Sequence, residues 1–152
     1  MRVTKISQKG IDLVKQFEGY SEKVDKCPAG IPTVGYGLTI YPNDQRVKMT
    51  DPPMSLKLAE LYLHEELNKF AAKVDSFTRD DITQNQLDAL TSFAYNLGAK
   101  ALQDSTLIKK VNANPLDPTI QKEFMKWVNA GGRKLEGLVR RRAAEWELYS
   151  QS

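Results

Sequence analysis

The 152-residue chain contains one cysteine, one histidine and no long hydrophobic run. The single cysteine, Cys27, cannot form a disulfide within the chain, and a chain of this length buries a core without one. Residues 1–6 contain no continuous apolar run, so we see neither a signal peptide nor a membrane span. We therefore expect synthesis in the cytoplasm. If the target lies outside it, we expect delivery by another factor or by an anchor absent from this chain.

The charge of the chain is only slightly unbalanced. Lysine and arginine together number 22, against 19 aspartates and glutamates, which gives a net charge of +3 and a pI of about 8.9. This excess mildly favours an anionic partner and is too small to indicate nucleic acid. Nothing in the sequence points to a metal or a cofactor, and the scarcity of exposed apolar stripes favours a monomer.

Helical periodicity dominates the chain. A first amphipathic helix ends near Gly19, and a long helix is expected over residues 55–74. Thr83 and Gln86 form a capping-box pattern for a central, buried helix that ends at Gly98. The expected class is α+β, with the β structure confined to the first third and the second half entirely helical. The later helical segments are expected at residues 105–113, 118–130 and 138–149.

Residues 24–41 differ from the rest, because they are rich in glycine, proline and β-branched side chains and predict a small antiparallel hairpin. The opposite sides of its second strand differ, since Gly35 and Gly37 share one face. Glycines inside a strand indicate a bulge or a close approach of backbone or ligand, although a tight bend would explain them equally well. The apolar face is formed by Val34, Tyr36, Leu38 and Ile40.

Glu18 is the first candidate for chemistry, because it ends the first helix just before the hairpin. A glutamate at the C-terminal end of a helix is most often simply solvated. The negative end of a helix dipole nevertheless favours the protonated form of a nearby carboxyl group. A protonated carboxyl group in a cleft is what a general acid for glycoside cleavage requires.

Cys27 is open to several interpretations. A lone cysteine is most often a small buried side chain, but a thiol also acts as a nucleophile when a histidine activates it. The only histidine, His64, falls on a polar face of the long helix, so a solvated His64 fits the pattern better. Asp25 and Glu22 are interpreted as solvated charges at the edge of a cleft.

The spacing of the candidates resembles that of a known family. Glu18 is followed after eight residues by Cys27, and after five more by Thr33. This pattern is similar to the Glu, then Asp or Cys, then Thr spacing of phage-type lysozymes, the muramidases that many phages use as endolysins. Further segments that resemble the central helix and the closing segment of that family are residues 84–98 and Trp127 with residues 137–145.

The resemblance implies roles for individual residues. The acid at the position of Glu18 protonates the glycosidic oxygen, the residue at Cys27 acts on the opposite face of the sugar, and Thr33 helps to position water or substrate. Whether Cys27 ionises as a base or nucleophile, or only holds the water, stays open. The resemblance also suggests that Arg141, with Arg142 as second choice, reaches the glutamate across the lobes. The hairpin residues expected to support substrate binding are Gly35, Tyr36 and Gly37.

The resemblance further implies an architecture and a function. We expect a lysozyme-like α+β domain with an N-terminal lobe (about 1–54), a connecting helix (about 55–74) and a helical C-terminal lobe (about 75–152), and with a cleft between the lobes. The expected activity is hydrolysis of the β-1,4 bond between N-acetylmuramic acid and N-acetylglucosamine in peptidoglycan, by an endolysin made in a bacterial host and acting on its wall. Leu38 stands where members often carry histidine, which leaves substrate preference open.

Three other functions are compatible with the same residues. A cell-wall binding module would keep the fold without the activity, and Cys27 and Leu38 favour that alternative. A cysteine amidase or peptidase would cleave wall peptides with His64 as its base. A chitinase-like hydrolase would cleave polymers that lack the lactyl ether.

Overall fold

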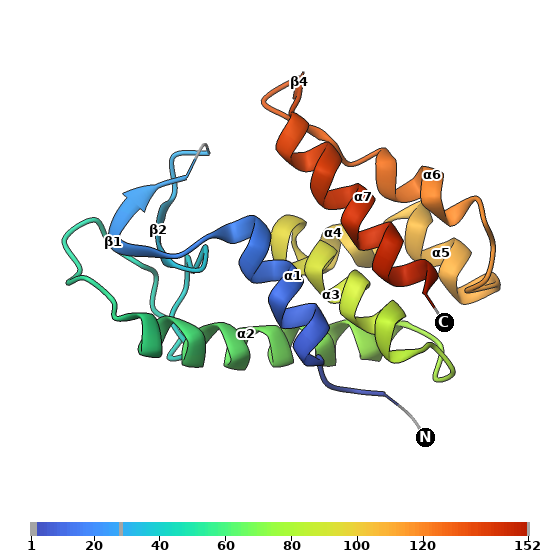
Figure 1. The fold of residues 1–152 in the computed structure, drawn as a ribbon, viewed down its shortest axis with the longest axis horizontal. Helices are drawn as coiled ribbons and strands as arrows, with labels where there is room; N and C mark the ends of the chain where they lie inside the picture. Colours follow the sequence, from blue (N-terminus) through green and yellow to red (C-terminus); the bar gives the residue numbers. More distant parts are fainter. Residues whose placement is uncertain (1–2, 28, 152) are drawn as a thin grey trace. The chain divides into compact units, whose positions relative to one another are not determined.

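A computed structural model describes residues 3–27 and 29–151 of the chain. The chain divides into two compact units, which we call the hairpin unit (residues 14–66) and the helical unit (residues 1–13 and 67–152). The boundaries between the units fall inside the first two helices. In chain order the elements are α1 (Gln8–Glu18), β1 (Ser21–Lys26), β2 (Pro32–Gly35), α2 (Leu56–Phe77), α3 (Gln84–Leu97), α4 (Ala99–Gln103), α5 (Thr106–Ala113), α6 (Ile120–Met125), β3 (Asn129–Ala130), β4 (Arg133–Lys134) and α7 (Glu136–Ser150) (Figure 1).

The hairpin unit is built around the antiparallel pair of β1 and β2. Asp25 pairs with Thr33, and the register is irregular between this pair and the pair of Ser21 with Gly35. Gly35 and Gly37 have φ angles of +67° and +71°, which residues with side chains rarely adopt. The chain therefore leaves the extended conformation at Gly35, and β2 ends there.

The predicted apolar face of the hairpin is confirmed for three of its four residues. Val34, Tyr36 and Leu38 are buried, whereas Ile40 is 38% exposed. Val34 and Leu38 exchange two backbone hydrogen bonds of 3.0 Å, which close a tight turn between them. Strand alternation cannot continue through such a turn, and Ile40 consequently falls outside the buried face.

The helical unit is centred on α3. Every residue from Gln86 to Ala94 is buried. Both bonds of the capping box are present, because the Gln86 backbone N–H donates to Thr83 Oγ1 at 3.1 Å and the Thr83 N–H donates to Gln86 Oε1 at 2.9 Å. At the other end, the Gly98 N–H donates to the Ala94 carbonyl at 2.7 Å. The predicted start, end and burial of this helix are confirmed.

Aromatic rings pack the space between α3 and its neighbours. The Phe93 ring of α3 contacts the rings of Phe124 and Trp127 edge to face, with centroids 6.0 and 5.4 Å apart. The helix α7 packs against both α3 and α6 (Figure 1). Rings in this geometry add a small attraction to the large apolar area that they bury, so this contact contributes to the core around α3.

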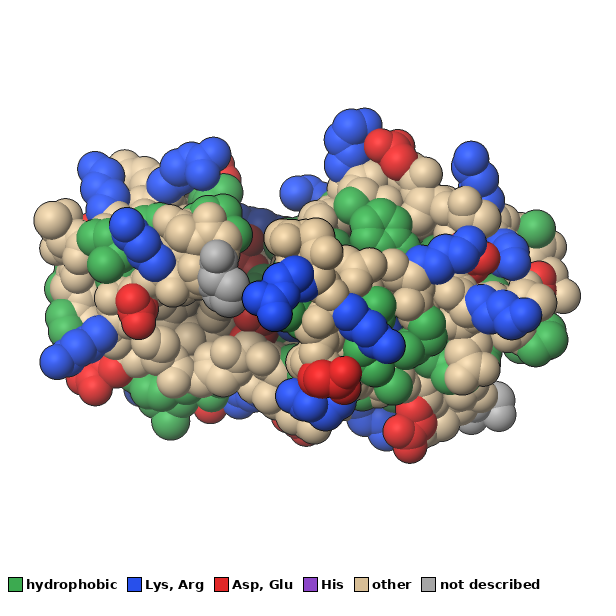
Figure 2. Space-filling view, turned by 90° about the horizontal axis from the view of Figure 1, so that it is seen from above, with side chains coloured by type: hydrophobic (Ala, Val, Ile, Leu, Met, Phe, Trp, Pro, Cys, Tyr) green, Lys and Arg blue, Asp and Glu red, His purple; other side chains and the backbone are tan. Residues whose placement is uncertain are grey.

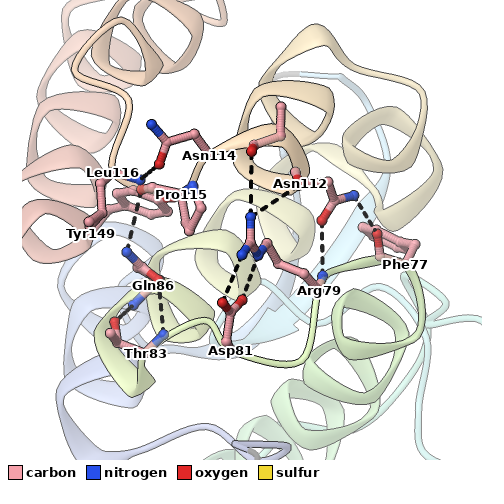
Figure 3. Close-up of polar contacts among 11 residues, drawn as sticks. Phe77, Arg79, Asp81, Thr83, Gln86, Asn112, Asn114, Pro115, Leu116 and Tyr149 are labelled. Atoms are coloured by element: carbon pink, nitrogen blue, oxygen red, sulfur yellow. Dashed lines mark hydrogen bonds and ion pairs between the residues drawn. The ribbon is translucent and has the colours of Figure 1, made fainter.

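The connection between α2 and α3 is held by the Asn112 side chain of α5 and by an ion pair within the connection (Figure 3). The Arg79 backbone N–H donates to Asn112 Oδ1 at 2.9 Å, and Asn112 Nδ2 donates to the Phe77 carbonyl at 2.9 Å. The Arg79 guanidinium pairs with Asp81 at 2.5 Å. These bonds satisfy backbone groups that no helix satisfies, so the connection keeps its shape without a regular element.

The prediction that the second half is entirely helical is wrong. The strands β3 and β4 form a two-residue antiparallel pair, joined by Gly131 and Gly132 at φ angles of +59° and +77°. Two adjacent glycines adopt this turn without steric cost. The helix expected over residues 118–130 is correspondingly shorter, because α6 ends at Met125.

The surface carries charges of both signs. On the face shown in Figure 2, lysine and arginine side chains are spread out, with aspartates and glutamates between them. Within the described ranges, no helix combines the length and the apolar character needed to cross a membrane.

Candidate active site

Glu18 is the last residue of α1, and it is half-buried. The helix ends here because Gly19, at a φ angle of +68°, turns the chain while its N–H donates to the Lys15 carbonyl at 3.0 Å. The predicted end of the first helix is confirmed. The carboxyl group of Glu18 therefore lies at the negative end of the helix dipole.

The Glu18 side chain lies directly against Gly37 in the turn after β2. A Cβ atom placed on Gly37 would be 2.9 Å from the carboxyl carbon of Glu18, closer than real Cβ atoms come to other atoms. The φ angle of +71° at Gly37 independently favours glycine. The predicted close approach of the backbone at a hairpin glycine is confirmed, and it positions the candidate acid.

Gly35 and Tyr36 make packing contacts within the hairpin unit. A Cβ atom on Gly35 would lie 3.2 Å from the Cβ of Ala59, so α2 packs tightly on the end of β2. Tyr36 is 9% exposed, its ring lies 5.8 Å from the Tyr20 ring, and Lys15 Nζ lies 5.5 Å from its centroid. These contacts hold the end of α1 to the hairpin, and a role of either residue in substrate binding stays a prediction.

Thr33 and Cys27 lie on the same hairpin as Gly37. The Thr33 hydroxyl donates to the Asp25 carbonyl at 3.1 Å, which leaves its oxygen able to accept a hydrogen bond. Cys27 directly follows β1, and its backbone N–H donates to the Ile31 carbonyl at 3.0 Å. Both side chains are half-buried, and the Cys27 thiol is free. The hairpin therefore presents a hydroxyl from β2 and a thiol from the residue after β1.

The other candidates of this unit are exposed to solvent. The exposed carboxylate of Asp25 accepts a hydrogen bond from the Lys26 backbone N–H at 2.8 Å. Glu22 on β1 and His64 on α2 are exposed as well. A solvated histidine agrees with the interpretation that His64 does not activate a nucleophile.

Arg141 and Arg142 are buried in the helical unit, where they share one carboxylate. Arg141 Nε lies 3.4 Å from Glu145 Oε2, and Arg142 Nε lies 3.0 Å from Glu145 Oε1. The Ser92 hydroxyl donates to Glu145 Oε2 at 2.6 Å. Arg142 also donates to Asn96 Oδ1 at 2.5 Å. We call Arg141, Arg142, Glu145 and Ser92 the buried charge cluster.

The electrostatics of this cluster set two large effects against each other. Burial raises the pKa of Glu145, and the charges of Arg142 and Arg141 and the Ser92 hydrogen bond oppose that rise. Arg141 and Arg142 are 4% and 0% exposed, so water screens these interactions little. The cluster therefore fixes the orientation of both guanidinium groups. An interaction of Arg141 with Glu18 stays a prediction.

Sequence reasoning missed Glu145 and Ser92. Glu145 follows Arg141 by four positions and Arg142 by three, and both spacings place side chains on one helix face. This spacing was the available signal. Ser92 carried none, because its contact with Glu145 joins two helices that are far apart in the sequence.

Among the described residues, no group of three or more histidine, cysteine, aspartate or glutamate side chains is placed to hold a metal ion. The side chains that the hairpin unit offers for chemistry are the carboxyl group of Glu18, the thiol of Cys27 and the hydroxyl of Thr33. A carboxyl group fixed by backbone, with a polar side chain nearby to orient water, is suited to acid-catalysed hydrolysis.

Comparison with known proteins agrees with this chemistry. The family described as phage lysozyme matches residues 15–145. An endolysin from Bacillus phage B103 is 40% identical over 149 residues, which is 95% of this chain and 53% of that protein. The chain thus spans about half the length of this relative.

Two solved structures share the fold over nearly the whole chain. An endolysin from Escherichia coli O157:H7 phage FAHEc1 is 36% identical, with a TM-score of 0.84, and the match covers 98% of this chain and 96% of that one. The muramidase domain of SpmX from Asticaccaulis excentricus is 28% identical, with a TM-score of 0.83, over 99% and 100% of the two chains. The predicted lysozyme-like α+β fold is confirmed.

Proposed function

Because the chain belongs to the phage lysozyme family, we propose that it cleaves the β-1,4 bond between N-acetylmuramic acid and N-acetylglucosamine in peptidoglycan. The expected class of enzyme, a glycoside hydrolase of the lysozyme type, follows from that membership. The observation that carries the proposal is the position of Glu18, at the end of α1 with its carboxyl group against Gly37. The bacterial wall is then the place of action, and the mild positive charge suits this anionic polymer.

In the proposed mechanism Glu18 is the general acid. It protonates the oxygen of the glycosidic bond as that bond breaks, which turns a poor leaving group into a neutral hydroxyl. The Gly37 backbone leaves little room for the carboxyl group to move toward the hairpin. A carboxyl group fixed in one position transfers its proton more efficiently than a mobile one.

Cys27 and Thr33 act on the water in this proposal. The Thr33 oxygen, whose proton is engaged with the Asp25 carbonyl, accepts a hydrogen bond from the water and orients it. Cys27 stands in for the aspartate of other family members, as a thiolate base or as a second group that holds the water. Arg141, fixed by Glu145 and Ser92, is proposed to stabilise the carboxylate that Glu18 becomes once it has given up its proton.

The first test is loss of turbidity of outer-membrane-permeabilised bacteria, with new reducing ends and new amino groups assayed in parallel. Glu18→Gln removes the acidic proton at nearly constant shape, and we expect activity to fall by about 10²–10⁴-fold. Glu22→Gln is the matched control, because Glu22 is an exposed glutamate of the same hairpin unit. Reducing ends that persist in Glu18→Gln would contradict the assignment.

The same assay separates the alternatives. New amino groups in place of reducing ends would indicate an amidase or peptidase, and binding to walls without either product would indicate a binding module. Cleavage of chitin as fast as of peptidoglycan would indicate a chitinase-like hydrolase.

The second test addresses Cys27. If the thiol replaces the family's carboxylate, Cys27→Asp keeps substantial activity, whereas Cys27→Ala loses on the order of tenfold or more. Both variants are smaller than or similar to cysteine in size, and the site is half-buried, so we expect both to fold. Equal rates for wild type and Cys27→Ala would refute a role in catalysis.

A further inference from the structure

The hairpin unit contains a hollow that none of the candidate catalytic residues lines. Its volume is about 470 Å³, and it lies between the loop of residues 41–54 and the first turns of α2, where Leu58 and Tyr62 line it. This volume falls within the range of pockets that hold small ligands. The residues that line it belong to one compact unit.

One wall of the hollow is aromatic and held in place by hydrogen bonds. The rings of Tyr41 and Tyr62 meet edge to face, with centroids 6.3 Å apart. The Tyr41 hydroxyl donates to Asp51 Oδ2 at 2.7 Å, and the Lys48 backbone N–H donates to the same oxygen at 2.9 Å. Both tyrosines are half-buried, so part of each remains accessible. The wall therefore offers a preorganised apolar surface.

The pKa shifts of Asp51 and Tyr41 keep the hydrogen bond between them intact at neutral pH. The Lys48 backbone N–H, and next the Tyr41 hydroxyl, hold the pKa of Asp51 below its usual value. Burial, and next the hydrogen bond to Asp51, raises the pKa of Tyr41 to about 12. Asp51 is thus an anion whose Oδ2 is already engaged, and Tyr41 keeps the proton that it donates.

The hollow is also lined by polar and positively charged residues. Arg46 and Lys48 are exposed and line the hollow together with the amides of Asn43 and Gln45. The turn that carries them is fixed, because the Tyr41 backbone N–H donates to the Gln45 carbonyl at 2.9 Å. Two cations thus face a hollow in which the lining carboxylate is already hydrogen-bonded, so the local field favours an anionic ligand.

We propose that this hollow binds an N-acetylmuramic acid unit of the glycan strand, with the sugar ring on the tyrosine wall and its carboxylate at Arg46 and Lys48. The identity of the ligand rests on the proposed function. A tyrosine ring suits the apolar face of a pyranose ring, and guanidinium and ammonium groups bind carboxylates through charge-assisted hydrogen bonds. Such a site holds the enzyme on its polymer independently of the residues that cleave it.

The direct test is residue-resolved NMR titration of the wild-type protein with the disaccharide N-acetylglucosaminyl-β-1,4-N-acetylmuramic acid. A muramidase does not cleave the bond within this disaccharide, so the probe stays intact. We expect saturable shift changes in residues 41–48 and 58–62. Chitobiose has the same two rings without the lactyl carboxylate, and we expect it to bind there about tenfold more weakly.

Single substitutions of Arg46 and Lys48 test whether their charges bind the carboxylate of the disaccharide. Arg46→Ala and Lys48→Ala remove exposed side chains, and we expect each to weaken disaccharide binding severalfold while binding of chitobiose stays unchanged. Lys57→Ala, an exposed lysine at the start of α2, is the matched control and is expected to have no effect. Shift changes confined to other segments, equal binding of the two disaccharides, or no effect of Arg46→Ala and Lys48→Ala would overturn the proposal.

This experiment also distinguishes failure of the hollow from failure of the proposed function. If the wild type clears no bacteria but residues 41–48 respond to the disaccharide as expected, the hydrolase assignment fails and the binding site stands. If the wild type releases reducing ends while residues 41–48 do not respond, the binding site fails and the hydrolase stands.

Discussion

The two units of this protein differ in how deeply they bury their candidate functional charges. The hairpin unit keeps Glu18 and Cys27 half-buried, within reach of solvent. The helical unit buries Arg141, Arg142 and Glu145 almost completely. A group that must exchange protons with a substrate needs access, whereas a charge that only fixes structure needs partners. The comparison separates residues expected to act in chemistry from residues expected to hold the fold.

Glycines with positive φ angles also differ in role between the two units. In the hairpin unit, Gly37 has a positive φ angle and lies against the Glu18 carboxyl group. In the helical unit, Gly132 also has a positive φ angle, but a Cβ atom placed there would meet nothing within 4 Å. The same conformation thus serves a candidate site in one unit and only a turn in the other.

The largest effect is expected on removing the shared carboxylate of the buried charge cluster. Glu145→Ala leaves two buried guanidinium groups without it, and we expect the free energy of unfolding to fall by about 3–5 kcal/mol. The control is Asp104→Ala, which breaks the exposed pair of Lys100 and Asp104 and is expected to cost less than about 0.5 kcal/mol. Denaturant unfolding measures both, and similar losses would show that burial is not what distinguishes the cluster.

The next effect concerns the glycine against Glu18. Gly37→Ala adds a strained φ angle, which costs about 1–2 kcal/mol, and it also pushes the Glu18 carboxyl group aside. We expect activity to fall by about 10²-fold, as for small displacements of a catalytic group. Gly132→Ala adds the strain alone, so it should lower stability to a similar degree and leave the release of reducing ends unchanged. Equal activity of the two variants would break the proposed link between Gly37 and Glu18.

The smallest effect is a dependence of stability on pH in the helical unit. Glu123 is buried, and its hydrogen bond to Lys126 is the largest cause that lowers its pKa, against burial, which raises it. A lowered pKa in the folded state means that the stabilisation is complete above the unfolded value of about 4.3 and is lost as the pH falls through the folded value.

Glu123→Gln tests this dependence. We expect the difference in unfolding free energy between wild type and variant to be greatest at neutral pH and to vanish in acid, where the wild-type side chain is also neutral. Glu147→Gln alters an exposed glutamate and serves as control. A difference between wild type and Glu123→Gln that does not change with pH would contradict this expectation.

Much of the fold was predictable from local patterns. The end of α1 at Gly19, the capping box of α3 and its end at Gly98 depend on residues close in the sequence, and all three were predicted. The β3–β4 pair was not, because the helical periodicity around Phe124 and Trp127 outweighed the two glycines that follow.

The candidate site was predictable to a different degree. The spacing of Glu18, Cys27 and Thr33 indicated the family, and the glycines indicated a close approach. Nothing in the sequence showed that the approaching group would be the Glu18 carboxyl itself. Leu38, which departs from the family pattern, is 4% exposed and contributes to packing.

The sequence alone determined where α1 ends, where α3 begins and ends, the order of the candidate residues and the family, because these depend on spacing along the chain. Tertiary structure decided the contact of Glu18 with Gly37, the hydrogen bond from Ser92 to Glu145, and the tyrosine-walled hollow. These features join groups from different elements. Their energies depend on burial and distance, which no local pattern specifies.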